Sequence, residues 1–267
     1  MSNSEEFPLG QYYDFFMYWK TPVITALVYV LVISALNPQT SGVSRVVAKS
    51  GKQPHKAPAK KSSRLFTAFI VFHNLVLCLF SGITFYNMGG AWLQNFRSRN
   101  FMDAFCDRGG KVWESDLQYW GWLFYLSKYY EIIDTIIILA KGRRSSFLQT
   151  FHHAGAIITM WYGTLHSATP IWIFVVFNSF IHTIMYFYYI LTCLGYSPPG
   201  KKYLTSMQIT QFVIGISLAL SYLFVDDCLT SDEGRWAVYL NASYVIPLTF
   251  LFKDFAKRTY GKKSKVV

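Results

Sequence analysis

Long apolar segments alternate with short polar ones over most of this 267-residue chain. A helix needs about 20 mostly apolar residues to cross the hydrocarbon core of a bilayer. About seven segments approach that length, so the pattern predicts an all-α polytopic membrane protein with about seven transmembrane helices. The expected spans cover residues 16–36, 65–88, 118–140, 147–165, 170–194, 203–225 and 236–256.

Composition supports a membrane protein with one domain. Hydrophobic residues make up 52% of the chain and charged residues 15%, whereas soluble domains carry about 25% charged residues. No polar stretch is long enough to form a second domain, so residues 1–267 are expected to form a single membrane domain. The net charge of +11 is compatible with nucleic-acid binding. The basic residues cluster between apolar segments, however, and no nucleic-acid partner is expected.

The basic clusters predict the orientation of the chain in the membrane. Segment 45–64 contains seven Lys or Arg residues and no acidic residue, and is typical of a flexible, solvated loop. Other basic clusters fall at 141–144, at 201–202 and in the tail 257–267, whereas the connections between them are acidic or balanced in charge. Because basic connections stay on the cytosolic side, we expect a lumenal N-terminus and a cytosolic C-terminus.

Three charged residues interrupt the third expected span, namely Lys128, Glu131 and Asp134. Each charge that faces lipid near the bilayer centre costs about 2.5–3.5 kcal/mol. These side chains are therefore expected to face the interior of the bundle and to neutralise one another. Two interpretations remain open: the residues form an ion-pair network that only holds helices together, or the same network also orients catalytic groups.

The next three spans each direct polar side chains to one helical face. Spacings of three and four residues place side chains on the same side of a helix. Because several spans do so, the polar groups are expected to converge on a site in the bundle core. They are Gln149, His152 and His153 in the fourth span, Asn178, His182, Tyr186 and Tyr189 in the fifth, and Gln208 and Gln211 in the sixth.

The spacing of these residues resembles that of a known enzyme family. Residues 128–135 read K-x-x-E-x-x-D-T, residues 182–189 read H-x-x-M-Y-x-Y-Y, and residues 205–211 read T-x-x-Q-x-x-Q. All three patterns are similar to motifs of the ELO-type fatty acid elongases. The family's histidine box H-x-x-H-H has Gln149 in its first position here, which resembles algal Δ9-type elongases of C18 polyunsaturated acyl chains. Glutamine forms hydrogen bonds but cannot exchange a proton.

The resemblance implies a 3-oxoacyl-CoA synthase of the endoplasmic reticulum membrane. Such an acyltransferase condenses an acyl-CoA with malonyl-CoA, releases CO₂ and gives a 3-oxoacyl-CoA that is two carbons longer. The helices would then enclose an acyl-chain tunnel, and acyl-CoA, malonyl-CoA and the bilayer would be the partners. No bound cofactor and no metal are expected. Contacts with the reductases and the dehydratase of the elongation cycle remain open, as does a homodimer.

The resemblance also suggests roles for the polar residues. His152 is expected to accept the acyl group, because a neutral imidazole can attack a thioester and form an acyl-imidazole. His182 is expected across the cavity, while His153 and Asn178 position malonyl-CoA or stabilise oxyanion charge. The residues expected to support these groups are Lys128, Glu131, Asp134 and Gln149, and those expected to bind substrate are Tyr186, Tyr189, Gln208 and Gln211. Four basic residues are expected to contact the phosphates of coenzyme A, unless they only set the orientation of the chain in the membrane: Arg143, Arg144, Lys201 and Lys202.

Two other classes of membrane protein share some of these features. A histidine-rich oxidase such as a desaturase needs more metal-ligating histidines than the six in the chain offer. A transporter or channel would also explain the charges in the third span, because intramembrane charges mark ion paths. Within the elongase class, a preference for saturated or monounsaturated acyl-CoA is the main alternative.

The cysteines and the C-terminal lysines lead to two further expectations, a disulfide and a retrieval signal. Cys106 and Cys228 fall in connections expected on the lumenal side, where disulfides persist, so a disulfide is expected between them; two free thiols are the alternative. Lys263 and Lys265 stand fifth and third from the end and resemble a dilysine retrieval signal of the endoplasmic reticulum, although a generic basic tail has the same composition.

Overall fold

A computed structural model describes residues 7–38 and 63–261 of the chain. Within these ranges every regular element is a helix, so the all-α prediction is confirmed. The basic loop expected at 45–64 and the tail expected at 257–267 lie largely outside the described residues, as do Lys263 and Lys265.

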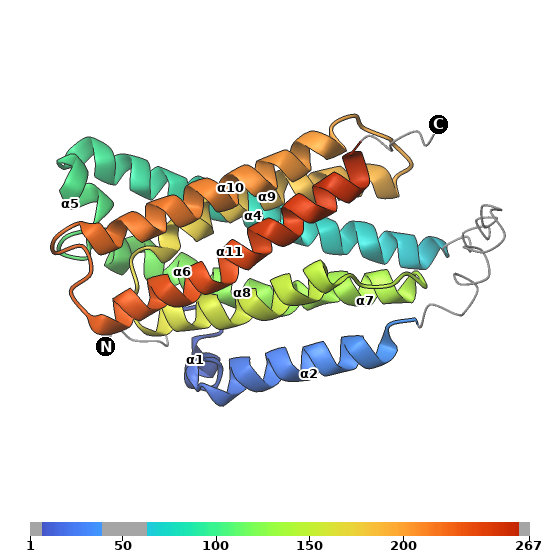
Figure 1. Ribbon diagram of the computed structural model, residues 1–267, viewed down its shortest axis with the longest axis horizontal. Helices are drawn as coiled ribbons and strands as arrows, with labels where there is room; N and C mark the ends of the chain where they lie inside the picture. Colours follow the sequence, from blue (N-terminus) through green and yellow to red (C-terminus); the bar gives the residue numbers. More distant parts are fainter. Residues whose placement is uncertain (1–6, 39–62, 262–267) are drawn as a thin grey trace.

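Long helices run side by side along the molecule (Figure 1). Between them lie the short helices η2 (Gly10–Tyr12), α1 (Tyr13–Met17), α5 (Phe101–Phe105) and η4 (Tyr222–Phe224), and the π-helical turn η3 (Trp113–Leu117). The long elements are α2 (Lys20–Leu36), α4 (Arg64–Ser98), the consecutive pair α6 (Gln118–Tyr130) and α7 (Ile132–Ala140), α8 (Phe147–Leu165), α9 (Ile171–Cys193), α10 (Lys201–Ser221) and α11 (Asp232–Tyr260).

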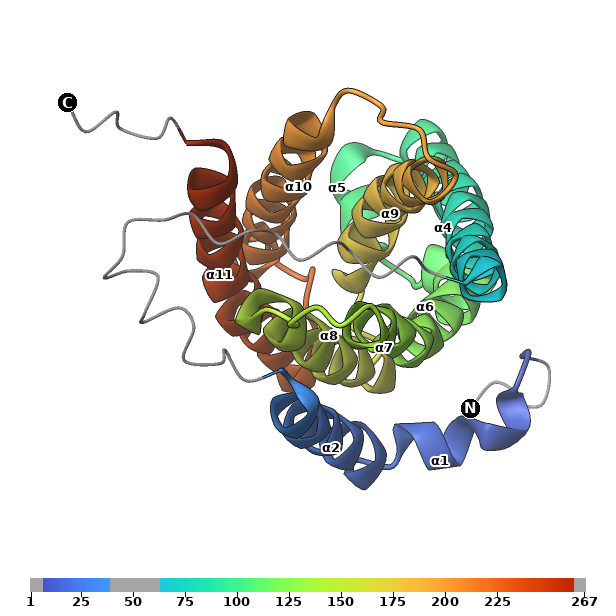
Figure 2. The same cartoon turned by 90° about the vertical axis from the view of Figure 1, so that its right-hand side faces the viewer.

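Seen from one end, six of these helices form a closed ring (Figure 2). Contacts run from α4 to α9, α10, α11, α8 and α6, and from α6 back to α4. Helix α2 lies outside this ring and packs on α8 and α7. The ring brings together α6, α8, α9 and α10, four of the helices that carry the polar side chains expected to converge.

The helix boundaries differ from the predicted spans in three places. Helix α4 continues to Ser98, so much of 89–117 is helical rather than a loop. The first expected span is bent by 71° between Gly10–Met17 and Lys20–Leu36. The third is divided at Glu131, where α6 ends and α7 begins.

Fewer helices than the predicted seven have the length and composition of a membrane span. Within the described residues, three helices are long and apolar enough to cross a membrane, or up to four if the bent pair counts as one span. The expected count of seven is therefore not confirmed. Three expected spans are missing from this count. The third is divided at Glu131 into two short helices and carries three charges, His152 and His153 lower the hydropathy of the fourth, and polar residues such as Asn241 lower that of the seventh.

A serine caps the start of α8, the helix that carries the histidine pair. The Ser146 hydroxyl accepts the backbone N–H of Gln149 at 3.2 Å, and the Ser146 carbonyl accepts the N–H of Thr150 at 3.1 Å. Such a cap satisfies a donor that the first helical turn leaves without a partner. The cap fixes where α8 begins and thereby fixes the direction in which Gln149 and His153 leave the helix.

A disulfide ties the connection after α4 to the connection before α11. The Cα atoms of Cys106 and Cys228 lie 4.7 Å apart, and 122 residues separate the two cysteines. Arg108 reinforces the link, because its guanidinium donates to the Asp226 carbonyl at 2.9 Å and to Asp103 at 3.0 Å. Hydrogen bonds from Arg108 and Asn100 hold the pKa of the Asp103 carboxyl below its ordinary value.

Removal of this disulfide is expected to lower stability. In the chain-entropy model a loop of this length contributes about 4–5 kcal/mol, which corresponds to a fall of about 10 °C in melting temperature for a protein of this size. Thermal unfolding of the Cys106→Ser/Cys228→Ser double variant in detergent measures it. Cys193→Ser, which removes a free thiol, is the matched control. Equal melting temperatures for the double variant and the parent would contradict the expectation.

Candidate functional site

A buried ion pair stands at the break between α6 and α7. Lys128 and Glu131 are 3% and 2% exposed, and the Lys128 ammonium donates to Glu131 Oε1 at 2.6 Å. The same ammonium lies 3.8 Å from the centroid of the Phe124 ring, a cation–π contact. Each buried charge therefore has a partner, as the cost of burying a lone charge requires.

Two residues of α9 extend this ion pair into a network of four polar side chains. Lys128 also donates to Asn178 Oδ1 at 3.3 Å, and the Asn178 amide nitrogen lies 3.1 Å from His182 Nε2. An amide nitrogen can only donate, so Nε2 of His182 accepts and the ring proton is on Nδ1. That Nδ1 lies 3.7 Å from Glu131 Oε1. His182 is thus held between the Asn178 amide and the Glu131 carboxylate.

Asp134 is the centre of a second group of hydrogen bonds. Its carboxylate accepts from His73 Nε2 at 2.9 Å and from the Tyr186 hydroxyl at 2.7 Å. Thr135, the next residue, shares a 2.8 Å hydrogen bond with Tyr29 of α2. Asp134 therefore joins α4, α7 and α9. His73 was not among the expected site residues, because a histidine of the second span with no motif around it favours a structural role; its position within an apolar span was the available signal.

His152 is anchored through one nitrogen by a tyrosine of α11. Its Nδ1 lies 2.8 Å from the Tyr244 hydroxyl, and the same hydroxyl donates to the His152 carbonyl at 2.8 Å. A phenol has one proton, so the Tyr244 oxygen accepts from Nδ1–H once it donates to the carbonyl. The lone pair of the neutral imidazole is then on Nε2, and His152 lines a cavity at the centre of the ring of helices.

Sequence reasoning missed Tyr244. The residue lies in an apolar span, where a tyrosine has the same pattern as a packing residue. The position of Tyr244 one α-helical turn from Asn241, a second polar residue of the same span, was the only available signal.

His153 points to a different partner from its neighbour. The Gln149 amide nitrogen lies 2.7 Å from His153 Nε2, so the glutamine donates and His153 carries its proton on Nδ1. The centroids of the His152 and His153 rings are 5.3 Å apart. The two adjacent histidines are therefore each fixed in one tautomer, by Tyr244 and by Gln149 respectively.

The central cavity has a volume of about 50 Å³, on the order of a few water molecules. Side chains of α6, α8, α9, α10 and α11 line it, among them Lys128, His152, Asn178 and Gln211. Gln211 Oε1 and Asn241 Oδ1 are buried without a hydrogen-bond partner and belong to residues of the cavity wall. The expected acyl-chain tunnel is therefore not open at this volume, but the wall offers acceptors to a ligand.

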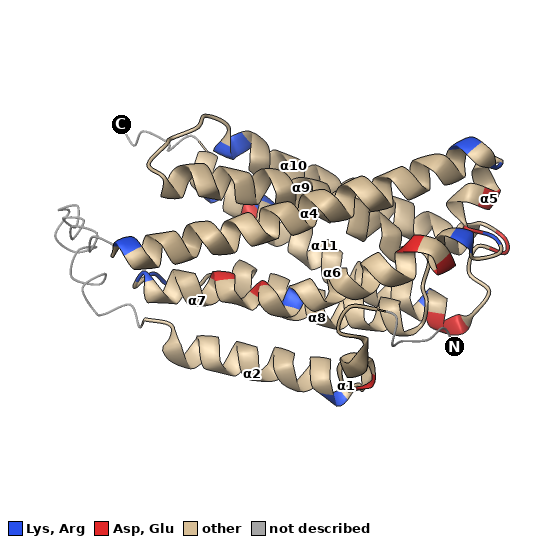
Figure 3. Cartoon of the chain, turned by 180° about the vertical axis from the view of Figure 1, so that it is seen from behind, with Lys and Arg blue, Asp and Glu red and all other residues tan. Residues whose placement is uncertain are grey.

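The other expected substrate residues are placed less centrally. Gln208 donates to Met185 Sδ at 3.5 Å, and Tyr189 is 40% exposed and packs edge-on against Tyr186. Arg143, Arg144, Lys201 and Lys202 are all exposed. Figure 3 shows that the basic residues of the α7–α8 connection and of the start of α10 gather at one end of the molecule, whereas acidic residues gather at the other.

Among the residues that the structure describes, no group of three or more His, Cys, Asp or Glu side chains has the arrangement of a metal site. The fold and this site together define a helical membrane protein with a network of charged and polar side chains in its core. A family model described as "ELO: GNS1/SUR4 family" matches residues 15–267. The chain therefore belongs to the GNS1/SUR4 family.

Curated relatives support this membership. The chain is 34% identical to "Fatty acid elongase A" of Dictyostelium discoideum over 78% of its own length and 77% of the relative. It is 32% identical to "Fatty acid elongase sre1" of the same organism, over 76% and 69%. "Long chain fatty acid elongase 2" of Caenorhabditis elegans is 28% identical over 71% of each chain.

Proposed function

We propose that the chain is a fatty acid elongase that condenses a long-chain acyl-CoA with malonyl-CoA through an acyl-imidazole on His152. Family membership supports elongation of fatty acids as the activity. The observation that carries the mechanism is the tautomer of His152, whose Nδ1–H is bound by Tyr244 while Nε2 retains its lone pair beside the central cavity.

The first step transfers the acyl group to the enzyme. Nε2 of His152 attacks the thioester carbonyl, a C–N bond forms, and the C–S bond breaks with departure of the coenzyme A thiolate. The imidazole gains positive charge during the attack. This charge strengthens the hydrogen bond that Nδ1–H donates to the Tyr244 oxygen. The small volume of the cavity, about 50 Å³, leaves room for few water molecules and so limits hydrolysis of the acyl-imidazole.

The second step makes the carbon–carbon bond. Malonyl-CoA loses CO₂, and the electron pair of the broken C–C bond becomes an enolate. The enolate attacks the acyl carbonyl, a new C–C bond forms, and the C–N bond to His152 breaks. Lys128 and the Asn178 amide lie at the cavity and supply positive charge and a donor where the enolate develops negative charge. His182, held by Glu131 and Asn178, is an imidazole of the same network that can move a proton.

The location of the substrates follows from charge. Coenzyme A esters are polyanions, and the exposed basic residues Arg143, Arg144, Lys201 and Lys202 lie at the end of the molecule that attracts them. We assign this end to the cytosol and the disulfide end to the lumen of the endoplasmic reticulum, with Gln208 and Gln211 in contact with polar parts of the substrate.

A C18 polyunsaturated acyl-CoA with a first double bond at Δ9 is proposed as the preferred substrate, on the basis of Gln149 in the histidine box. Purified protein supplied with malonyl-CoA and a panel of C18 acyl-CoAs is expected to form 3-oxo-C20 products fastest from the linoleoyl and α-linolenoyl thioesters. Mass spectrometry of the products measures this preference. Products from saturated or monounsaturated chains alone would reject it and leave elongation intact, whereas no product from any chain would reject elongation.

A further inference from the structure

A buried histidine of α4 has no part in the two steps described above. His73 is 0% exposed, and its Nε2 donates to Asp134 Oδ1 at 2.9 Å. Its Nδ1 is buried and has no hydrogen-bond partner among the described residues. A buried polar atom without a partner is unfavourable, so an imidazole is a costly choice where only packing is needed. The hydrogen bond to Asp134 is therefore what His73 contributes beyond an apolar residue.

Asp134 depends on His73 because its carboxylate has few other donors. The second oxygen, Oδ2, accepts the Tyr186 hydroxyl at 2.7 Å. Among the residues that the structure describes, no lysine or arginine forms an ion pair with Asp134, and the buried Lys128 donates to Glu131. His73 and Tyr186 thus hold one carboxylate oxygen each, and removal of His73 leaves the carboxylate free to rotate.

Tyr186 connects this carboxylate to His182. The tyrosine is 1% exposed and lies one helical turn after His182 on α9. The centroids of the two rings are 5.4 Å apart with an interplanar angle of 88°, an edge-to-face contact. A shift of the Tyr186 ring would therefore move the His182 ring, whose Nδ1 lies 3.7 Å from Glu131 Oε1.

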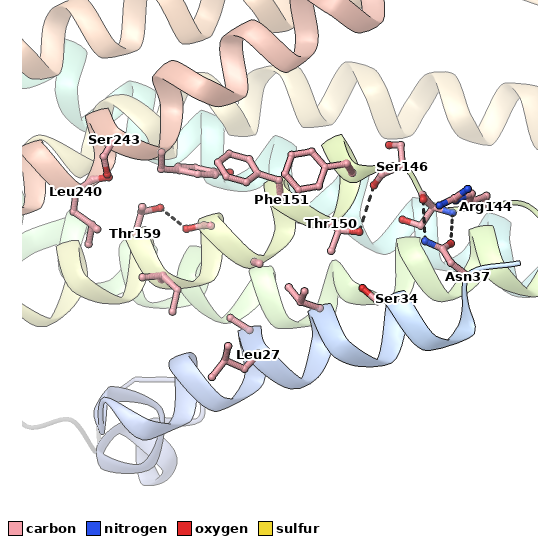
Figure 4. A pocket seen from close by; sticks show the side chains of 18 residues that line it. Leu27, Ser34, Asn37, Arg144, Ser146, Thr150, Phe151, Thr159, Leu240 and Ser243 are labelled. Carbon is pink, nitrogen blue, oxygen red and sulfur yellow. Dashed lines mark hydrogen bonds between the residues drawn. The ribbon is translucent and has the colours of Figure 1, made fainter. Parts of the chain in front are cut away.

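Helix α7, which carries Asp134, is also held by α2. Tyr29 of α2 shares its 2.8 Å hydrogen bond with Thr135, the residue after Asp134. At the end of α2, Asn37 donates to the Ser145 carbonyl at 3.1 Å and accepts the Ser145 N–H at 2.8 Å, beside a groove between α2 and α8 (Figure 4). Because α2 fixes α7 and the connection that follows it, a change at His73 is expected to move the Asp134 side chain rather than the helix.

We propose that His73 is a positioning residue that fixes the ring of His182 for the condensation step. It holds Asp134, and the Tyr186 hydroxyl on the same carboxylate passes this constraint to His182. The proposal rests on the proposed function, in which His152 receives the acyl group first and His182 acts in the second step. Acylation of His152 involves none of the contacts of His73. Loss of the His73 hydrogen bond is therefore expected to slow condensation and to leave acylation unchanged.

Two amide substitutions test the hydrogen bond. Glutamine places its amide nitrogen near the position of imidazole Nε2 and can donate to Asp134, whereas asparagine is one methylene shorter and reaches only the position of Nδ1. His73→Asn is expected to lower kcat about tenfold with little change in KM for malonyl-CoA, and His73→Gln is expected to stay within about twofold of the parent. Mass spectrometry of the product formed by the full chain in detergent measures both. An equal loss in the two variants, or no loss in His73→Asn, would overturn the proposal.

Two further measurements separate positioning from a general loss of folded protein. The rate at which acyl-CoA alone acylates His152 is expected to equal that of the parent in both variants, and a parallel fall of acylation and product would contradict the proposal. NMR of protein with isotope-labelled histidines is expected to show His182 with its proton on Nδ1 in the parent and in His73→Gln, and both tautomers in His73→Asn. The His182→Gln variant assigns the signal, and one tautomer in all three proteins would also contradict the proposal.

The path through Tyr186 is tested on a second background. Tyr186→Phe keeps the ring but removes the hydroxyl that binds Asp134, so His73→Asn is expected to cause little further loss there. Independent effects would multiply and would reject this path. If the parent forms product without an acyl adduct, the acyl-imidazole is rejected and the comparison of kcat still decides the role of His73. If the parent forms no product from any chain, elongation is rejected and the NMR signal of His182 decides whether His73 positions that ring.

Discussion

The His152→Ala variant is expected to lose product formation by about a thousandfold or more, because the atom that carries the acyl group is removed. The lone pair of Nε2 has no replacement among the two neighbouring imidazoles: His182 Nε2 accepts from Asn178 and His153 Nε2 accepts from Gln149. Product is measured by mass spectrometry with purified variant and parent. Incubation with acyl-CoA alone is expected to add an acyl group to His152 in the parent and none in the variant.

Two control variants keep this prediction specific. Gln149→Ala removes a hydrogen bond to His153 but no proton-transfer group, so a fall of only about tenfold is expected. Tyr244→Phe keeps the ring against Gly155 but removes the acceptor of Nδ1–H, which lets His152 change tautomer. It is expected to reduce kcat more than it raises KM. Near-normal turnover by His152→Ala, or an acyl adduct on another residue, would reject His152 as the nucleophile.

The second large effect is expected at Lys128. Lys128→Met leaves Glu131 as a buried charge without its partner, which typically costs about 3–5 kcal/mol and corresponds to a fall of about 10 °C in melting temperature. Thermal unfolding in detergent measures the change, and Lys257→Met, at an exposed position of α11, is the control. A variant as stable as the parent would show that the pair does not support the fold.

The double variant Lys128→Met/Glu131→Gln distinguishes the two interpretations of this network. It removes both charges, so most of the lost stability is expected to return. If the network only holds helices together, activity returns with stability. If Lys128 also stabilises the developing enolate and Glu131 orients His182, activity stays at least about a hundredfold below the parent. The second result is expected.

The convergence of polar groups could be predicted from spacing alone. Lys128, Glu131 and Asp134 follow steps of three residues in an apolar segment, and the cost of facing lipid leaves only the interior for them. The sequence does not contain the partners, however. Asp134 binds His73 and Tyr186 rather than Lys128, because these donors on α4 and α9 lie closer to it in the folded chain.

The break between α6 and α7 and the position of α2 could not be predicted from the hydropathy pattern. Hydropathy averages over a segment, so the break at Glu131 left no separate signal. Lys20 and Pro22, which interrupt the first expected span, were the sign of the 71° bend before α2. The position of α2 could not be predicted either, because whether it lies in the ring or outside it depends on packing between segments far apart in sequence, which periodicity along one helix does not report. Tyr244 gains its importance in the same way, through contact with α8.

The disulfide sets the order in which the protein can mature. Cys106 is synthesised 122 residues before Cys228, which at about 5–20 residues per second is an interval of roughly 6–24 s. Helices α6 to α10 are all made during this interval, so the first cysteine waits as a thiol while most of the ring inserts. Closure of the bond therefore requires a chain made at least as far as Cys228. In the orientation proposed above, a nascent chain that stalls before Cys228 keeps a thiol that lumenal oxidoreductases can capture.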